Sequence, residues 1–296
     1  MRTLMTQHPM HARLIGATDQ TVSHADVHMH TNFSDGMGTV EDVLAHVEDN
    51  TDLDVIAITD HDTIEGALRA RDLVAAQRPR FELIVGEEIS TREGHLLALF
   101  IEKRIAPGQS IERSIEQIRD QGGIAIIAHP FNPVFRHSVR RPVFDRLMRQ
   151  PDLLPDAVES LNGSFAGIGS SAVTMRLCRE RYHLPETGSS DAHTPTAIGV
   201  ARTAFPGMGA TGLRAAIMAG ETLPLGGFWL AREYVIIGSH RIAYGRAGLY
   251  RAAEAQPEVR AARLRATTMG WSARAARRMY GHPALPMTMG AGEGRW

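Results

Sequence analysis

Short apolar runs alternate along the chain with segments in which apolar residues recur at helical spacing. Each run has five or six residues, the pattern of a strand buried on both faces. The runs cover residues 55–59, 81–85, 96–101, 124–128 and 157–161, and the intervening patterns predict helices over about 39–50, 65–77, 110–121 and 170–182. With segments near residues 25–30 and before residue 190, we expect about seven strands alternating with helices, which favours an α/β fold with a parallel sheet.

Residues of the kind that bind metals follow the predicted strands. His28 and His30 are two apart on an extended segment, so both imidazoles can face one ion, and Asp35 follows on a turn closed by Gly36. Further residues of this kind stand at or just past strand ends, namely His61, Glu88, His129, Asp191 and His193, while His95 opens the run 96–101. In closed parallel barrels the chemistry lies at the carboxyl ends of the strands, so we expect one metal site there. Mixed imidazole and carboxylate ligands suit zinc, manganese or iron.

The composition is that of an ordinary soluble protein, and its 296 residues suffice for one barrel-type domain with an appendage or for two domains. The net charge of −1 hides an asymmetry, because residues 227–296 hold 11 Arg against 4 Glu. A single cysteine, Cys178, excludes a disulfide or a thiolate cluster within the chain. No apolar run approaches the roughly 18 residues of a membrane span, so we expect a cytoplasmic protein without a membrane partner.

Three regions are expected. Residues 1–21 lack periodicity and are predicted to be a flexible lead-in, 22–230 carry the strands and the metal-type residues, and 231–296 form an Arg-rich, mostly helical extension. Helices are predicted there over 243–255, 257–268 and 272–280. The arginines could bind a phosphate-bearing polymer or pack on the acidic barrel; few stacking aromatics favour packing.

Several short motifs together resemble the PHP family, named for its members in DNA polymerases and histidinol phosphatase. They are Asp26-Val27-His28-Met29-His30, Ser34-Asp35-Gly36, Thr59-Asp60-His61-Asp62, Gly86-Glu87-Glu88-Ile89-Ser90 with His95, Ala128-His129-Pro130, Val158-Glu159 and Ser190-Asp191-Ala192-His193. The resemblance implies, for residues 22–230, a distorted (β/α)7 barrel that holds two to three divalent ions and, in many members, hydrolyses phosphoesters.

Carried over by position, the resemblance implies a ligand set of nine residues. The first ion would be held by His28, His30, Glu88 and Asp191, the second by Glu88, His95 and His129, and the third by Asp35, His61 and His193. Glu87 replaces Glu88 if the strand register slips by one residue. Asp60 and Asp62 are expected to support the ligands, Glu159 either to support them or to bind a metal directly, and Asn162 to contact substrate.

A different barrel class, the amidohydrolase type, also begins with His-x-His but bridges its metals with a modified lysine. The chain has one lysine, Lys103, beyond the fourth predicted strand in the charged cluster Glu102-Lys103-Arg104. A solvated Lys103 is the preferred interpretation, because Glu88 is available to bridge.

The leading functional hypothesis is hydrolysis of a phosphomonoester, such as a nucleotide or sugar phosphate, by a metal-bridged hydroxide. A basic loop leaves the strand before His129, and in it Arg136 or His137 is predicted to bind phosphate oxygens, with Arg140 and Arg141 less favoured. Asp191 and His193 are the other predicted catalytic residues; His193 or a metal-bound water would protonate the leaving oxygen. Two alternatives are a 5′-3′ exonuclease on single-stranded or short oligonucleotides, which keeps nucleic acid as a possible partner, and a non-catalytic metal-binding module. His95 and His129 are only 34 positions apart, which leaves no room for a helical subdomain covering the site, and the oligomeric state is open.

Overall fold

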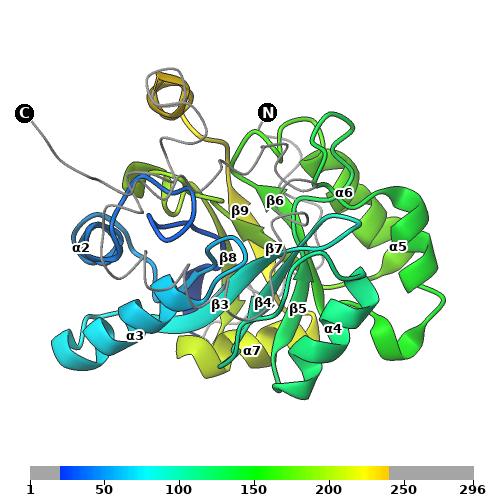
Figure 1. Ribbon diagram of the computed structural model, residues 1–296, viewed down its shortest axis with the longest axis horizontal. Helices are drawn as coiled ribbons and strands as arrows, with labels where there is room; N and C mark the ends of the chain where they lie inside the picture. Colours follow the sequence, from blue (N-terminus) through cyan, green and yellow to red (C-terminus); the bar gives the residue numbers. More distant parts are fainter. Residues whose placement is uncertain (1–20, 240–296) are drawn as a thin grey trace, which may run out of the picture.

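The computed structural model describes residues 21–239, which fold around one sheet (Figure 1). Within this part of the chain the sheet has nine strands in the order β7-β6-β5-β4-β3-β2-β1-β8-β9. They are β1 (Val22–Asp26), β2 (Val55–Ile58), β3 (Glu82–Ser90), β4 (His95–Leu99), β5 (Ile124–Ile127), β6 (Ala157–Asn162), β7 (Glu186–Ser189), β8 (Ala201–Pro206) and β9 (Leu223–Gly226). The first seven match the predicted strands; β8 and β9 add to them.

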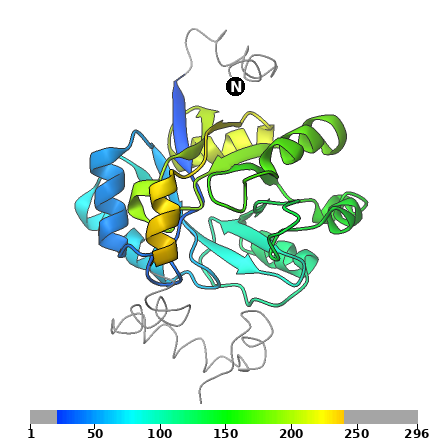
Figure 2. The same cartoon turned by 90° about the horizontal axis from the view of Figure 1, so that it is seen from above.

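The helices lie on the outside of the sheet, as the view from above shows (Figure 2). They are α2 (Val40–Asn50), α3 (Glu65–Gln77), α4 (Ile111–Asp120), α5 (Arg141–Leu147), α6 (Ser171–Leu177), which continues as a π-turn over Cys178–Tyr182, and α7 (Gly209–Ala219). A capping box begins α2: the Thr39 hydroxyl accepts from the Asp42 amide, and Asp42 accepts from the Thr39 amide. All four predicted helices are confirmed, each within about two residues of its expected ends.

The strand directions only partly follow the prediction. β1, β2 and β3 pair in parallel, as do β5, β6 and β7. The expectation of parallel pairing is wrong for β4, β8 and β9, which are antiparallel to their neighbours. β4 runs backwards because only Thr91 to Gly94 separate it from β3, and so short a connection can join only antiparallel strands. His95 therefore enters the site from the first residue of its strand.

The sheet nearly closes into a barrel. Past its last residue, β7 returns to the start of the sheet: the Ser190 amide donates to Asp26 (3.0 Å) and the His30 amide donates to the Ala192 carbonyl (2.9 Å). Within the strands, the Thr203 hydroxyl of β8 accepts a hydrogen bond from the Gly188 amide of β7 and donates one to the Gly188 carbonyl. The structure thus confirms the expected distorted barrel.

Both faces of the sheet are buried. On β2, Ile56 and Ile58 belong to an apolar cluster with α2, α3 and α4, whereas Val55 and Ala57 belong to a second cluster with α7. This two-sided burial explains why the strand sequences read as continuous apolar runs. Because successive side chains point to opposite faces, this burial also decides which side chain at the end of each strand points into the barrel.

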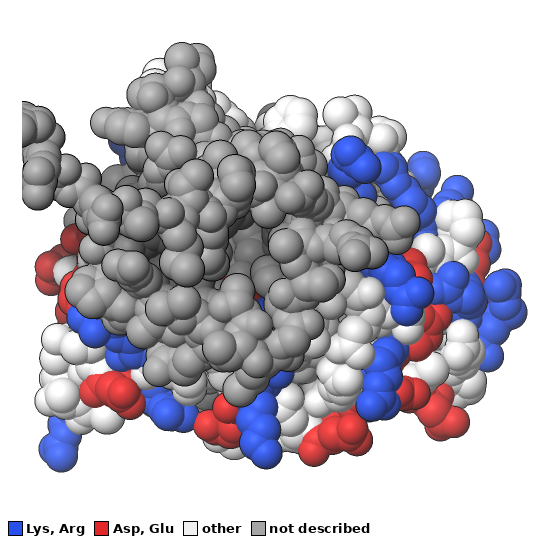
Figure 3. Space-filling model, viewed as in Figure 1, with Lys and Arg blue, Asp and Glu red and all other residues white. Residues whose placement is uncertain are grey.

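Charged side chains are interspersed on the described part of the face in Figure 3, with acidic and basic groups side by side. Exposed ion pairs among the described residues include Arg69 with Glu41 and Arg113 with Glu116. No helix among residues 21–239 is long and apolar enough to span a bilayer.

Some expectations fall outside residues 21–239. These are the flexible lead-in and the three helices predicted over 243–255, 257–268 and 272–280. Residues 231–239, which we assigned to the extension, are helical, and Tyr234 and Ile237 pack against the apolar cluster under α2 and α3.

Candidate metal centre

Six imidazoles and three carboxylates meet at one end of the barrel, where the parallel strands end. We call these nine residues the ligand cluster; they are His28, His30, Asp35, His61, Glu88, His95, His129, Asp191 and His193. The rings are in mutual contact, with centroids 4.3 Å apart for His30 and His193 and 4.6 Å apart for His30 and His61. All nine residues predicted as ligands are thus brought together.

Glu88 lies in the middle of the cluster. Its Oε1 lies 2.7 Å from His95 Nδ1 and 3.1 Å from His129 Nε2, while its Oε2 lies 3.0 Å from His61 Nδ1 and 3.2 Å from His28 Nε2. The two oxygens of one carboxylate therefore face two different pairs of imidazoles. A carboxylate that bridges two cations requires this arrangement.

The strand register excludes Glu87 from this role. Glu87 is the preceding residue of β3, so its side chain points to the opposite face. There its Oε2 accepts a hydrogen bond from the Ile105 amide (2.9 Å), and burial raises its pKa to about 8. Glu88, in the interior of β3 and not past its end as expected, is the glutamate of the cluster.

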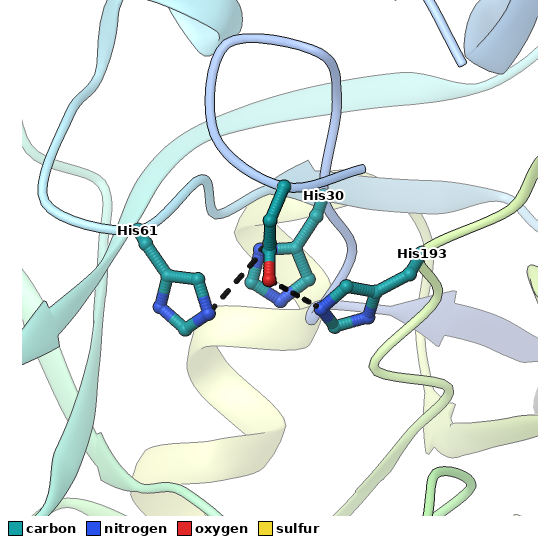
Figure 4. Close-up of side chains that lie close together, drawn as sticks. His30, His61 and His193 are labelled. Atoms are coloured by element: carbon teal, nitrogen blue, oxygen red, sulfur yellow. Dashed lines mark hydrogen bonds and ion pairs between the residues drawn. The ribbon is translucent and has the colours of Figure 1, made fainter. Parts of the chain in front are cut away.

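Asp35 faces a second side of the cluster. Its Oδ2 lies 3.2 Å from His193 Nε2, and its Oδ1 lies 3.8 Å from His61 Nε2. Figure 4 shows the imidazoles of His61 and His193 on either side of His30. Ligand atoms of His30, Asp35, His61 and His193 all lie within 4.8 Å of one another, as required for one shared ion.

Asp191 faces the third side. Its Oδ1 lies 3.1 Å from His30 Nε2 and 3.4 Å from His28 Nε2. Its Oδ2 accepts hydrogen bonds from Ser164 Oγ (2.7 Å) and Asn162 Nδ2 (3.2 Å). The carboxylate is thereby held with one oxygen directed at the imidazoles.

The donor atoms fit metal ions. Buried ligand atoms of the cluster lack a hydrogen bond within the described residues, among them His28 Nε2, His30 Nδ1, Asp35 Oδ1 and His129 Nδ1. Each such atom costs about 1–3 kcal/mol when it is left unsatisfied, and a shared cation removes that cost. Cys178 is buried at the end of α6, so the donors are nitrogen and oxygen atoms, as zinc, manganese and iron accept.

The ligand cluster also divides into smaller groups around possible ions. Besides the set around Asp35, ligand atoms come together in His28 with His30 and Glu88, in His61 with Glu88 and His95, and in His28 with His129 and Asp191. These groups overlap with the predicted first and second sets without repeating them. The division of the nine residues among individual ions stays a prediction.

Charges within the cluster stabilise one another. Burial alone would lower the pKa of His61, but the carboxylates of Glu88 and Asp35 raise it to about 10. Burial would raise the pKa of Glu88 and Asp191, but the surrounding imidazoles hold both well below their usual range. The carboxylates are therefore ionised at neutral pH and available to cations.

Side chains behind the ligand cluster hold the ligand residues in place by hydrogen bonds. His28 Nδ1 donates to Glu159 Oε1 (2.9 Å), and Glu159 Oε2 accepts from the His129 amide (2.8 Å) and from Asn162 (2.9 Å). Asn162, predicted to contact substrate, thus bonds to two carboxylates.

Asp60 accepts from Thr31 and Ser34, on the loop that leads to Asp35, and Asp62 accepts from the Ser90 amide. Both aspartates support the site as predicted. They do so through hydroxyl and backbone groups, whereas the expected partner was a ligand imidazole.

The basic loop after β5 is anchored to the cluster. The His137 ring stacks on His95 with centroids 4.7 Å apart, and the His137 carbonyl accepts from the His95 amide (2.8 Å). Burial and the neighbouring imidazole of His95 lower the pKa of His137 to about 4, so His137 is uncharged at neutral pH. Arg140 donates to the carbonyls of Asn132 and Phe135 and so holds the loop itself.

Two predicted side chains lie outside these contacts. Arg136 is exposed and makes no ion pair or hydrogen bond with the described residues, so its guanidinium is available to an anion. Lys103 is exposed, with its backbone bonded to the Gln121 side chain, and cannot bridge metals in the cluster.

The chain resembles known proteins in both sequence and structure. The family model described as PHP domain matches residues 26–129, which include seven residues of the ligand cluster. The family model described as PHP-associated matches residues 176–222, which include Asp191 and His193. An uncharacterized protein of Methanocaldococcus jannaschii is 36% identical over 149 residues, 47% of this chain and 81% of that protein. The chain belongs to the PHP family.

Solved structures share the PHP fold. A two-domain protein of Bacteroides vulgatus, named as containing a predicted PHP-like metal-dependent phosphoesterase, matches with a TM-score of 0.58 and 20% identity over 70% of this chain and 66% of that one. PsfC of Pseudomonas syringae matches with a TM-score of 0.54 and 18% identity over 75% of this chain and 99% of that one. At these identities the likeness concerns the PHP fold.

Sequence reasoning missed three residues at the PHP metal centre. Ser164 bonds to Asp191, as described above. Trp229 donates from Nε1 to the Ser190 carbonyl (2.8 Å), and its ring lies 5.7 Å from that of His193; the buried Glu233 accepts from Thr194, the residue after His193. Ser164 stands two residues past the end of β6, where a serine gives no metal-binding signal, and Trp229 and Glu233 follow β9, a strand that was not predicted.

Proposed function

We propose that this PHP domain is a metal-dependent phosphoesterase that hydrolyses a small phosphomonoester, such as a nucleotide or sugar phosphate. The nine residues of the ligand cluster would hold two to three divalent ions, zinc, manganese or iron. The observation that carries the proposal is Glu88, whose two carboxylate oxygens each lie within 3.2 Å of two imidazoles. Bound there, the ions would activate a water molecule and neutralise charge on the phosphoryl oxygens.

The protein's own residues orient these ligands. Because an ionised carboxylate only accepts hydrogen bonds, the bond between His28 and Glu159 places the proton on Nδ1 and leaves the Nε2 lone pair of His28 for a cation. Ser164 and Asn162 donate to Oδ2 of Asp191 and so leave its Oδ1 for a cation. Such support acts on metal affinity and on the geometry of attack.

Arg136 is the favoured phosphate ligand of the basic loop. The loop is tied to the cluster through the His95 amide, and Arg140 is already bonded to carbonyls. A guanidinium binds two phosphoryl oxygens at once. His137, stacked and uncharged, would position the loop and not neutralise the anion.

His193 fits the role of ligand better than that of proton donor. Its Nδ1 lies 2.9 Å from the Asp191 carbonyl, which only accepts, so Nδ1 carries the proton. One nitrogen, Nε2, then remains beside Asp35 for a metal or a proton, and not for both. A ligand at this position leaves the protonation of the leaving oxygen to another group.

The test is identification of products after manganese- or zinc-loaded protein is incubated with nucleoside monophosphates, sugar phosphates and a 5′-phosphorylated oligonucleotide. Free phosphate with loss of one monoester is the expected result, abolished by Asp191→Asn and retained by the exposed-residue control Asp72→Asn. Mononucleotides released from the oligonucleotide would overturn the proposal in favour of the exonuclease alternative. Metallated protein that leaves every compound intact would favour the non-catalytic alternative.

A further inference from the structure

A segment after β9 closes one side of the metal centre. The Trp229 amide donates to the Gly163 carbonyl (2.8 Å), and its indole Nε1 donates to the Ser190 carbonyl (2.8 Å). Its ring contacts that of His193 at 5.7 Å between centroids. Trp229 thus joins the loop that supports Asp191 to the loop that carries His193. The helix over residues 231–239 follows directly.

Glu233 fixes that helix against the ligand loop. Its carboxylate is 1% exposed and accepts hydrogen bonds from Thr194 Oγ1 (2.5 Å) and Thr196 Oγ1 (3.0 Å), with Arg232 Nε donating to its other oxygen (2.9 Å). Two hydroxyls within three residues of His193 therefore depend on one helical carboxylate. These hydrogen bonds hold the helix over residues 231–239 next to the loop that carries His193.

Tyr234 follows Glu233 on this helix and has a hydroxyl without a partner. Its ring lies 5.5 Å from that of Trp229, and its hydroxyl oxygen is buried without a hydrogen bond among residues 21–239. Burial, together with the nearby charge of Asp191, raises the pKa of the phenol, so the hydroxyl keeps its proton at neutral pH. A buried hydroxyl without a hydrogen bond destabilises the fold, so stability does not account for it.

We propose that Tyr234 is a substrate-binding residue of this PHP centre, whose hydroxyl donates a hydrogen bond to a phosphoryl oxygen of the bound monoester. The proposal rests on the proposed function. The Tyr234 ring contacts Trp229, whose ring contacts His193. An anion is the fitting partner because the protonated phenol lacks an acceptor, and phosphoryl oxygens are strong acceptors.

The test compares wild-type protein with Tyr234→Phe, full-length and manganese-loaded, by equilibrium dialysis against inorganic phosphate and by KM for a hydrolysed monoester. We expect phosphate affinity to fall about 10-fold and KM to rise similarly, the loss typical of a hydrogen bond to a charged group. The metal content and melting temperature should not fall, because the variant removes no hydrogen bond of the described structure.

Tyr182→Phe is the matched control. The Tyr182 hydroxyl donates to Asp145 Oδ1 (2.8 Å) at the end of α6, so its loss should lower the melting temperature and leave phosphate affinity unchanged. Equal phosphate affinity of Tyr234→Phe and wild type at equal metal content would overturn the proposal. Wild-type protein that binds phosphate but hydrolyses no monoester would count against the proposed function alone, since the affinity comparison still decides the role of Tyr234.

Discussion

The Nδ1 nitrogen of His28 lies 2.9 Å from Oε1 of Glu159, and both side chains are fully buried. The bond fixes the tautomer and the plane of the His28 ring, and with them the direction of the Nε2 lone pair, which lies 3.2 Å from Glu88. Glu159 therefore acts on the metals through His28. Its own second oxygen is occupied by the His129 amide and Asn162.

Glu159→Ala should weaken metal binding by about 10- to 100-fold, because removal of an outer partner lets the ligand ring rotate and lowers its basicity. Glu159→Gln, which keeps an acceptor oxygen but loses the charge, should weaken it less. Competition with a metallochromic chelator measures both affinities. The exposed control Glu102→Gln should match wild type, and equal metal affinity in wild type and Glu159→Ala would contradict the role of Glu159.

Gly36→Ala should remove the contribution of Asp35. A Cβ at Gly36 would overlap the backbone carbonyl of His30, so the turn must move and carry Asp35 with it. We expect loss of about one metal equivalent per chain, measured by elemental analysis after dialysis. Gly227→Ala is the matched control, since a Cβ there has open space and the φ angle is not in the left-handed region. A full metal content in Gly36→Ala would show that Asp35 is not required for binding.

Ser164→Ala should impair the centre without unfolding the protein. The hydroxyl oxygen lies 2.7 Å from both Asp191 Oδ2 and Asn162 Oδ1, and its loss leaves Asn162 Nδ2 as the remaining partner of Asp191 Oδ2. We expect a stability loss of about 1–3 kcal/mol and a fall of about 10-fold in metal affinity. Urea unfolding and chelator competition give the two values. Unchanged metal affinity would mean that Asn162 suffices.

The metal-free protein should lose stability as the pH rises from 6.5 towards 10. Against the effect of burial, Glu88 and Asp35 raise the pKa of His61 from 6.5 to about 10. A raised folded-state pKa stabilises fully below the unfolded value, and the stabilisation disappears as the pH rises through the folded value. Glu87, raised by burial from 4.5 to about 8, acts in the same direction up to that pH.

Metal-loaded protein should behave in the opposite way, because the ions compete with protons for the imidazoles and bind more tightly as the pH rises. The difference in melting temperature between manganese-loaded and chelator-treated samples should therefore widen over this interval. Thermal unfolding at a series of pH values measures it. A difference that narrows with rising pH would contradict a centre built on these histidines.

The barrel and the nine clustered residues could be predicted because both leave local signals. Buried strands read as apolar runs, and ligands such as His61 and His129 stand directly after them. The direction of β4 left no such signal, since an apolar run looks the same in either direction; the short connection before His95 decides it. Strands β8 and β9 were missed because neither reads as a continuous apolar run: β8 contains Arg202 and Thr203, and both strands contain a proline.

The supporting residues depend on tertiary structure. Asp60 and Glu159 are both buried acids near ligands, yet one binds loop hydroxyls and the other an imidazole, a difference set by the facing element. Trp229 and Tyr234 reach the centre only because the chain after β9 turns back over it. No periodicity encodes that return.

The most direct test of the account is a titration of chelator-treated protein with manganese while the release of inorganic phosphate from a monoester is followed. The account predicts no release without metal and a rate that rises to a plateau at about two to three equivalents per chain, the number that a bridged multinuclear centre holds. Full metal occupancy without phosphate release, or release that is independent of added metal, would contradict it.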